Sequence, residues 1–213
     1  MINAKRSVVP PPSLAAGKRY NARDVIEALL RDFGGKCYLC EIPLSVRQQS
    51  VDHRKPKAGF PDLEFAWANL FPSCRDCNER RPAFPAEGLL DPATDDVESR
   101  LCQSMQRDTF AGIDTPAFEA RDPRDLCAAA TARELYHIHN SKSVKAAELR
   151  AAINERIDEI LERLLELQRH GNTTRGPVRA ALEDPLRVDF SRRSPFTALV
   201  RSRLGAGFEH LFD

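Results

Sequence analysis

The sequence predicts an α+β fold that is mostly helical and that contains a small metal-clasped module near its N-terminal end. Two pairs of cysteines, Cys37-Tyr-Leu-Cys40 and Cys74-Arg-Asp-Cys77, enclose the candidate module. Beyond it, apolar residues recur every three or four positions over a long stretch, which is the pattern of amphipathic helices. Of the 213 residues, 30% are charged and 42% are hydrophobic, which is typical of a soluble globular protein.

The first 35 residues are expected to form an extended segment followed by one helix. Val8 to Ser13 is rich in proline, which favours extended backbone lying over the surface. Asn21 is the candidate N-cap of the helix, and Gly34-Gly35 is its stop signal. Apolar residues at helical spacing follow the cap, namely Val25, Ile26, Leu29, Leu30 and Phe33.

Residues 36–92, here called the cysteine module, form the candidate catalytic part. Zinc favours four tetrahedral thiolate or imidazole ligands, and a Cys-x-x-Cys turn brings two sulfurs to one ion. So small a segment cannot fold on a core of its own, and metal binding would supply folding free energy. We therefore expect one structural Zn²⁺ on Cys37, Cys40, Cys74 and Cys77. Redox-active or unliganded cysteines are the alternative.

The expected compartment supports metal binding by these cysteines. No N-terminal run is apolar enough for a signal peptide, and no stretch approaches the roughly 18 apolar residues of a membrane span. A cytoplasmic location is therefore expected, and in that compartment cysteines are metal ligands more often than disulfides. Cys102 and Cys127 stand apart from the pairs, and we expect both to be buried free thiols within helices.

Asp52 and His53 lie between the two cysteine pairs, at the end of a strand predicted from Ser50. Phosphodiester hydrolysis requires a base for the water and a metal for the developing charge. Histidine serves as a base near pH 7, whereas carboxylate and carboxamide oxygens suit Mg²⁺ or Mn²⁺. Because neighbours on a strand point to opposite faces, both can act on one site only at a strand end or a bulge. The alternative is a structural His-Asp hydrogen bond.

Three phrases together resemble the HNH (ββα-metal) endonuclease motif in its zinc-bound form. They are Asp52-His53, Trp67-Ala68-Asn69-Leu70 and Cys74-x-x-Cys77-Asn78. The resemblance implies that His53 activates water and that Asp52 and Asn78 hold a catalytic Mg²⁺ or Mn²⁺. It also implies that Asn69 fixes the loop that orients the base.

The sequence departs from that motif at its third phrase. Asn78 stands where a histidine is frequent, although its side chain still offers a carbonyl oxygen. Arg81 falls where a lysine often follows and is expected to contact the scissile phosphate, with an ordinary surface arginine as the alternative. Pro82 limits the helix near Cys77 to little more than one turn, unless the helix resumes after a kink.

A narrower resemblance extends over the proline-rich start and the cysteine module. Several phrases are similar to the nuclease subunit of Septu anti-phage systems: Cys37-Tyr-Leu-Cys40-Glu41, His53-Arg54-Lys55-Pro56-Lys57, Phe60-Pro61-Asp62-Leu63, Phe65-Ala66-Trp67-Ala68-Asn69-Leu70 and Leu90-Asp91-Pro92. In that family the nuclease works beside an ABC-type ATPase, so the resemblance implies a PtuA-like partner. Past Pro92 the resemblance is mainly one of helical layout.

Residues 93–213 are expected to form a helical region. Asp122-Pro123 is predicted to begin a helix that reaches Tyr136, because proline is tolerated in a first turn. A longer helix is predicted from Ser141 to Arg169, followed by an arginine-rich helix and a last one ending at Leu204. The long helix is either the spine of this region or a docking surface. Its apolar stripe comprises Leu149, Ile153, Ile157, Ile160, Leu164 and Leu167.

The net charge of +1 is low for a chain that binds nucleic acid unaided. Positive charge is local: Arg54, Lys55 and Lys57 follow His53, and seven arginines lie within residues 171–203. Each cluster is either a binding patch or an ordinary solvated surface. The low net charge indicates that a partner helps to deliver the nucleic acid. As the substrate, DNA is expected rather than RNA. The other histidines are interpreted as structural or surface residues: His137, His139, His170 and His210.

Together these patterns predict a metal-dependent endonuclease that acts with an ATPase in anti-phage defence. Two alternatives remain open. One is a stand-alone, restriction-like HNH DNA endonuclease, which near-neutral charge disfavours. The other is a non-catalytic zinc module that only binds nucleic acid, which the complete set of Asp52, His53 and Asn78 disfavours.

Overall fold

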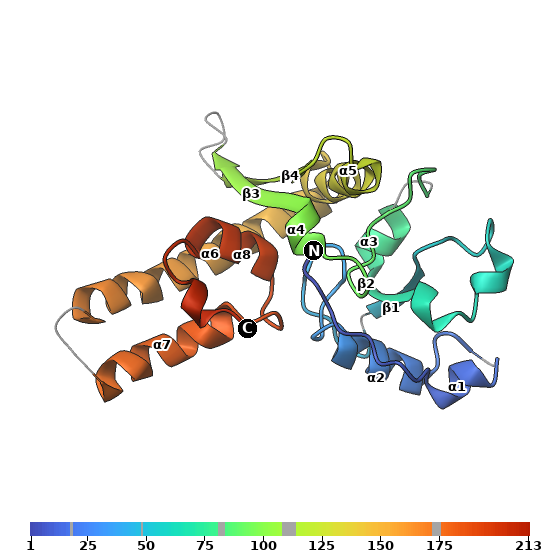
Figure 1. Ribbon diagram of the computed structural model, residues 1–213, viewed down its shortest axis with the longest axis horizontal. Coiled ribbons are helices and arrows are strands. Elements are labelled where there is room, and N and C mark those ends of the chain that lie inside the picture. Colours follow the sequence, from blue (N-terminus) through green and yellow to red (C-terminus); the bar gives the residue numbers. More distant parts are fainter. Residues whose placement is uncertain (18, 48, 81–83, 108–113, 172–175) are drawn as a thin grey trace.

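The computed structural model describes residues 1–17, 19–47, 49–80, 84–107, 114–171 and 176–213, and Figure 1 shows its elements in two groups. The group on the right comprises α1 (Pro12–Ala15), α2 (Arg23–Asp32), β1 (Gln49–His53), β2 (Leu70–Cys74) and α3 (Arg75–Arg80). The other group, which extends from the top centre to the left, comprises α4 (Val97–Arg100), β3 (Leu101–Arg107), β4 (Asp114–Ala120), α5 (Leu126–Asn140), α6 (Val144–Gly171), α7 (Pro177–Asp189) and α8 (Thr197–Leu204). Three short 3₁₀ turns complete the described elements: Pro61–Leu63, Trp67–Asn69 and Glu209–Leu211. The prediction of mixed structure that is mostly helical is confirmed.

The N-terminal helix α2 forms close to where the apolar pattern places it. Val25 and Leu29 are fully buried on its inner face. The cap position is occupied by Ala22 and not by Asn21, so the predicted start is wrong by one residue. Gly34 and Gly35 follow the helix with φ angles of 66° and 72°, a conformation that glycine adopts without strain. The predicted stop is therefore confirmed.

Strands β1 and β2 pair antiparallel in regular register, from Gln49 opposite Cys74 to His53 opposite Leu70. Helix α3 follows β2 directly and packs against both strands. The order of strand, strand and helix is the one that the HNH resemblance implies, and membership of that family stays a prediction. Arg80 is the last described residue of α3.

The region after residue 92 contains a pair of strands that the sequence analysis did not predict. β3 and β4 pair antiparallel, from Leu101 opposite Ala120 to Arg107 opposite Asp114. The alternating pattern is obscured because the buried positions include the polar Gln103 and because Pro116 lies within β4. The expectation of a wholly helical region is corrected here.

Two smaller expectations for this region are also corrected. Cys102 lies on a strand and not on a helix, and both Cys102 and Cys127 are half-buried. Helix α5 starts at Leu126, because the Asp125 side chain caps it by accepting the N–H of Ala128 (3.0 Å).

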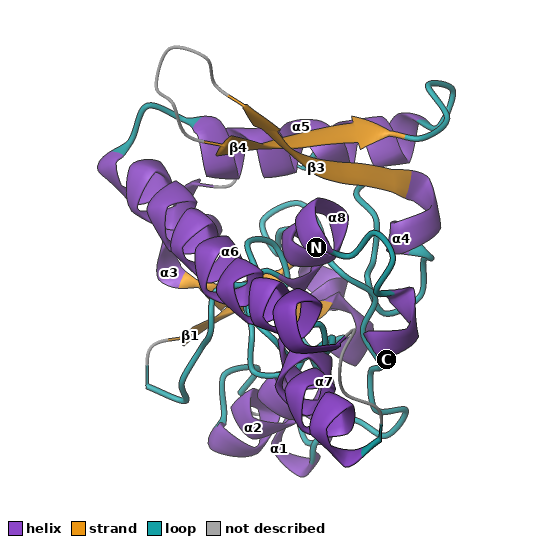
Figure 2. Cartoon of the chain, turned by 90° about the vertical axis from the view of Figure 1, so that its left-hand side faces the viewer, coloured by secondary structure: helices purple, strands orange, loops and turns teal. Residues whose placement is uncertain are grey.

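The long helix α6 confirms the predicted apolar stripe, since every residue of the stripe is buried. Figure 2 shows α6 running diagonally across the molecule beside α7 and α8. The helix begins at Val144, three residues later than predicted. Among the described residues, no helix is both long enough and apolar enough to cross a membrane.

One cluster of buried apolar residues runs through both groups of elements; it includes Phe71 of β2, Leu135 of α5 and Ile153 of α6. Polar contacts add to it. The Lys36 ammonium is buried, donates to the Ser194 carbonyl (2.7 Å) and pairs with Glu41 (3.1 Å). The shared core crosses the boundaries predicted at residues 35 and 92, and the division of the chain into three parts stays a prediction.

Candidate metal centre and active site

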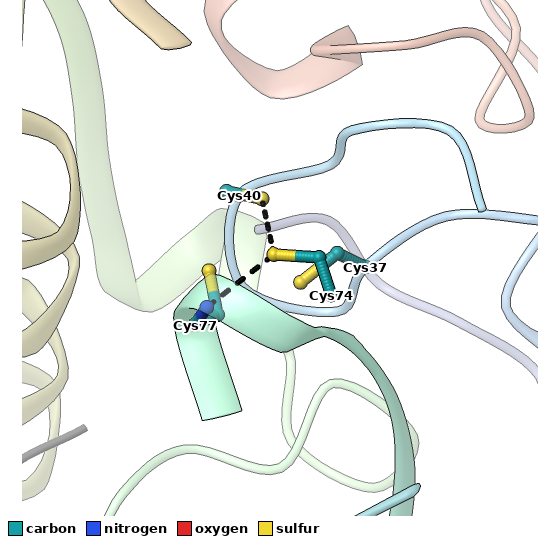
Figure 3. Close-up of side chains that lie close together, drawn as sticks. All are labelled: Cys37, Cys40, Cys74 and Cys77. Carbon is teal, nitrogen blue, oxygen red and sulfur yellow. Dashed lines mark hydrogen bonds between the residues drawn. The ribbon is translucent and has the colours of Figure 1, made fainter. Parts of the chain in front are cut away.

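The four cysteines of the two pairs come together at one point, as Figure 3 shows. Their sulfur atoms all lie within 4.8 Å of one another, and none forms a disulfide. Cys37 and Cys40 belong to the turn after α2, whereas Cys74 ends β2 and Cys77 lies in the first turn of α3. Segments far apart in the sequence thus supply two sulfurs each.

The geometry of this cluster fits a tetrahedral zinc ion. With Zn–S bonds of about 2.3 Å, sulfurs at the corners of a tetrahedron lie about 3.8 Å apart. The Sγ atoms of Cys40 and Cys74 are 3.9 Å apart. The N–H of Cys77 donates to Cys74 Sγ (3.4 Å), a contact that favours a thiolate over a thiol. The donor set and its spacing therefore support a structural metal such as Zn²⁺.

The thiol pKa values show why these side chains favour a cation. Burial disfavours the charged form of Cys37, but hydrogen bonds from Cys40, Cys74 and Cys77 hold its pKa well below the usual value. Hydrogen bonds to Cys37 in turn raise the pKa of Cys40 and Cys77 well above theirs. Without a cation, the thiols compete for the negative charge, and a bound divalent cation would stabilise all four thiolates.

Asp52 and His53 occupy the end of β1, and each is held by a different neighbour. Asp52 is buried, and its Oδ2 accepts a hydrogen bond from the hydroxyl of Tyr38 (2.5 Å). Tyr38 lies between the first two cysteines. His53 is 9% exposed, and its ring packs edge-on against Tyr20 at 4.6 Å. β1 ends at His53 with regular pairing and without a bulge, so both residues lie at a strand end, and their action on one site stays a prediction.

The contact of His53 with the loop between β1 and β2 indicates which ring nitrogen carries the hydrogen. Nε2 lies 3.0 Å from the carbonyl oxygen of Glu64. A carbonyl oxygen only accepts, so Nε2 carries the hydrogen and Nδ1 carries the lone pair of the neutral ring. The ring is thereby oriented with a basic nitrogen, as a general base requires.

Asn69 binds the same loop with both ends of its amide. Its Oδ1 accepts the N–H of Lys55 (2.8 Å), and its Nδ2 donates to the carbonyls of Lys55 (3.0 Å) and Leu63 (3.2 Å). Asn69 is buried, so these bonds are made away from water. They join the two sides of the loop that passes over His53, and a role of Asn69 in catalysis stays a prediction.

The remaining predicted site residues lie on or after α3. Asn78 is exposed on this helix, one position after Cys77 of the four-cysteine cluster. Arg81 and Pro82 fall outside the described residues, so the expected phosphate contact of Arg81 stays a prediction.

Two residues that the sequence analysis did not single out support the site. The Tyr38 hydroxyl orients Asp52. The Arg6 guanidinium donates to the carbonyls of Trp67 and Leu70 (2.8 Å each) and lies 4.4 Å from the Phe71 ring, and burial lowers its pKa to about 10. Position in a Cys-x-x-Cys turn was an available signal for Tyr38, whereas nothing local pointed to Arg6.

One of the other histidines and several arginines of the basic cluster have structural contacts. His139 is buried against Phe118, and burial lowers its pKa to about 4, so its ring is neutral. Arginines of the 171–203 cluster form ion pairs within the protein: Arg179 and Arg187 with Glu183, Arg192 and Arg201 with Glu98, and Arg203 with Asp114. These contacts favour the solvated-surface interpretation of that cluster.

Comparison with known proteins finds one partial similarity. Over 78 residues the chain is 35% identical to "Septu protein PtuB" of Bacillus thuringiensis. The match covers 35% of this chain and 30% of the length of that protein. No protein-family model matches the chain, and no solved structure matches it. Part of the chain is thus similar to part of a Septu protein.

Proposed function

We propose that this chain is a metal-dependent endonuclease of the HNH type and the effector nuclease of a Septu-type anti-phage system. The similarity to a PtuB protein supports the system, and the cluster of four cysteines supports the zinc-bound form. The observation that carries the catalytic part is the loop over His53. Asn69 closes this loop, and the Glu64 carbonyl leaves His53 with a basic Nδ1.

In the proposed mechanism His53 takes a proton from the attacking water, and Asn69 keeps the loop that holds the ring in place. Asp52 and Asn78 offer oxygen atoms, which suit a hard cation. A Mg²⁺ or Mn²⁺ ion held by them would stabilise the charge that develops on the leaving oxygen. Arg81 is proposed to bind the scissile phosphate.

A partner is proposed because the chain has little net charge with which to bind nucleic acid at physiological salt. We propose a stable complex with a PtuA-like ABC-type ATPase in the cytoplasm, contacted mainly through segments outside residues 36–85. Co-expression of the two proteins followed by size-exclusion chromatography tests this complex. Separate elution, together with efficient cleavage by the nuclease alone, would favour a stand-alone restriction-like enzyme.

A plasmid-nicking assay tests the activity. Purified protein is incubated with supercoiled DNA, with Mg²⁺, Mn²⁺ or neither, and with or without the ATPase. We expect nicking only when a divalent ion is added, and faster nicking with the partner. Binding of DNA without nicking under every condition would reject the nuclease and favour the non-catalytic zinc module.

A further inference from the structure

Two phenylalanines of the loop that contacts His53 are partly exposed, and one of them, Phe60, also packs edge-on against Phe84 with ring centres 6.1 Å apart. Phe60 and Phe65 are each 39% exposed, and they flank the segment that ends at Glu64, whose carbonyl contacts His53. Figure 1 shows this loop between β1 and β2 at the right-hand edge of the molecule. A single exposed phenylalanine needs no explanation. Two of them beside a candidate active site indicate a surface that a ligand covers.

Lysines lie next to these rings. The Lys55 ammonium is 5.5 Å from the centre of the Phe60 ring, and that of Lys57 is 5.0 Å from the centre of the Tyr20 ring. Tyr20 itself packs against His53. Aromatic rings interleaved with cations are what proteins use to hold unpaired nucleic acid, with rings for the bases and cations for the phosphates.

The charge of this surface is too small for binding by phosphates alone. Arg54 is turned inward, where it donates to the Leu89 carbonyl and lies 3.9 Å from Asp91. Lys57 is 3.5 Å from Glu64, although its side chain remains 51% exposed. About two cations are thus available for phosphates, so contacts with bases must supply much of the affinity.

The loop that carries the rings is held in one conformation. Asn69 clamps it at Lys55 and Leu63. Within it, the Pro56 carbonyl accepts the N–H groups of Gly59 and Phe60 (3.0 Å each). A preformed loop loses little conformational entropy on binding, which favours stacking of a base on a fixed ring.

We propose that the loop of residues 55–65 is a stacking platform for unpaired bases, with Phe60 and Phe65 as the rings and Lys55 and Lys57 as the phosphate contacts. The substrate class is then a single-stranded or locally melted segment of nucleic acid, because the faces of paired bases are covered by their neighbours. The link to cleavage rests on the proposed nuclease function, whereas the binding itself does not.

Fluorescence anisotropy with the full chain, in buffer without added Mg²⁺ or Mn²⁺, tests the platform. The probes are oligothymidylate, oligouridylate, an abasic strand and a duplex, each of about 12 nucleotides, which is within the range of common single-strand sites. We expect either base-bearing strand to bind roughly 5- to 150-fold more tightly per stacked base than the abasic strand. The slope of log K against log salt should be about −1.4, the value for two phosphates.

Substitutions locate the site. Phe60→Ala with Phe65→Ala should remove the preference for bases over the abasic strand. Phe60→Trp should keep it, since the larger ring still stacks, and this variant guards against loss through misfolding. Tyr136→Ala is the matched control, because Tyr136 is a 56% exposed aromatic residue on α5.

Equal binding of base-bearing and abasic strands would overturn the proposal, as would tighter binding of the duplex or a double variant that behaves like the control. These results are independent of the proposed function. A chain that nicks DNA but shows no preference for bases loses the platform alone. A chain that prefers bases but never nicks loses the nuclease alone.

Discussion

The helical region and the cysteine module are stabilised in different ways. In the helical region, the stripe of α6 lies in the core, and Ile153 and Ile160 have no exposed surface. In the cysteine module, β1 and β2 form a two-stranded sheet among the described residues, and most of β1 is half-buried. A two-stranded sheet is marginally stable by itself. The module therefore adds a cluster of four cysteines and polar bonds to its share of the common core, whereas the helical region is held mainly by apolar packing.

The two regions differ in what fixes the positions of their side chains and backbone. Apolar packing sets the position of a helix, but it leaves no polar atom available for chemistry. Hydrogen bonds such as those of Asn69 and Tyr38 fix individual side chains and loops. The candidate catalytic residues all lie in the region that is held by such bonds, which is what a site with oriented polar groups requires.

The largest effect is expected from loss of the metal. Cys74→Ser should lower zinc content and unfold the cysteine module, because metal binding to such sites contributes about 10–16 kcal/mol of apparent folding free energy. The buried stripe of α6 should keep much of its helical signal. Elemental analysis, circular dichroism and hydrogen exchange measure these three quantities.

Cys102→Ser is the matched control, since Cys102 lies on β3 outside the cluster. A zinc-free purified protein, or a Cys74→Ser variant with wild-type hydrogen exchange in β1 and β2, would show that the module does not need the metal.

The next effect concerns rate and not stability. His53→Ala should lower nicking by roughly 10²–10⁴-fold, the range for general-base catalysis, while zinc content stays unchanged because His53 is outside the sulfur cluster. His137→Ala, an exposed histidine on α5, should cleave like the wild type. Full activity in His53→Ala would remove the proposed mechanism.

The features that the sequence predicted correctly are the local ones. The apolar stripe of α6 repeats every three or four residues, and burial of the whole stripe follows from that period. Likewise, each Cys-x-x-Cys turn fixes the relation of two sulfurs within four residues, so a four-sulfur cluster required only that the two turns meet.

Features that depend on distant partners were missed. The Arg6 side chain donates a hydrogen bond to the Trp67 carbonyl, 61 residues away in the sequence, and no local sequence pattern indicates such a pair. β3 was hidden because Gln103, which is buried, is polar; its amide accepts from and donates to the backbone of Met1. Burial of a polar side chain that finds a partner breaks the apolar alternation by which strands are recognised.

A cavity in the helical region should lower the free energy of unfolding more than the loss of any single polar bond in the module. Ile153→Ala removes a fully buried side chain and should lower the free energy of unfolding by about 2–5 kcal/mol without changing zinc content. Chemical denaturation measures the change. Leu165→Ala on the same helix is the control, because Leu165 is 40% exposed and should cost much less. Equal losses would show that α6 does not anchor the core.

The smallest of these effects separates structure from function within the module. Asn69→Ala leaves the Lys55 N–H and two carbonyls without their partner, and should cost about 1–3 kcal/mol of unfolding free energy. Asn154→Ala is a matched control, because the Asn154 amide donates to the carbonyls of Asp114 and Arg150 outside the site. Both variants should lose similar stability, as measured by urea denaturation. Only Asn69→Ala should also lower the nicking rate at a temperature where both remain folded, because only this residue holds the loop over His53. Equal nicking rates in the two variants would show that the Asn69 bonds serve folding alone.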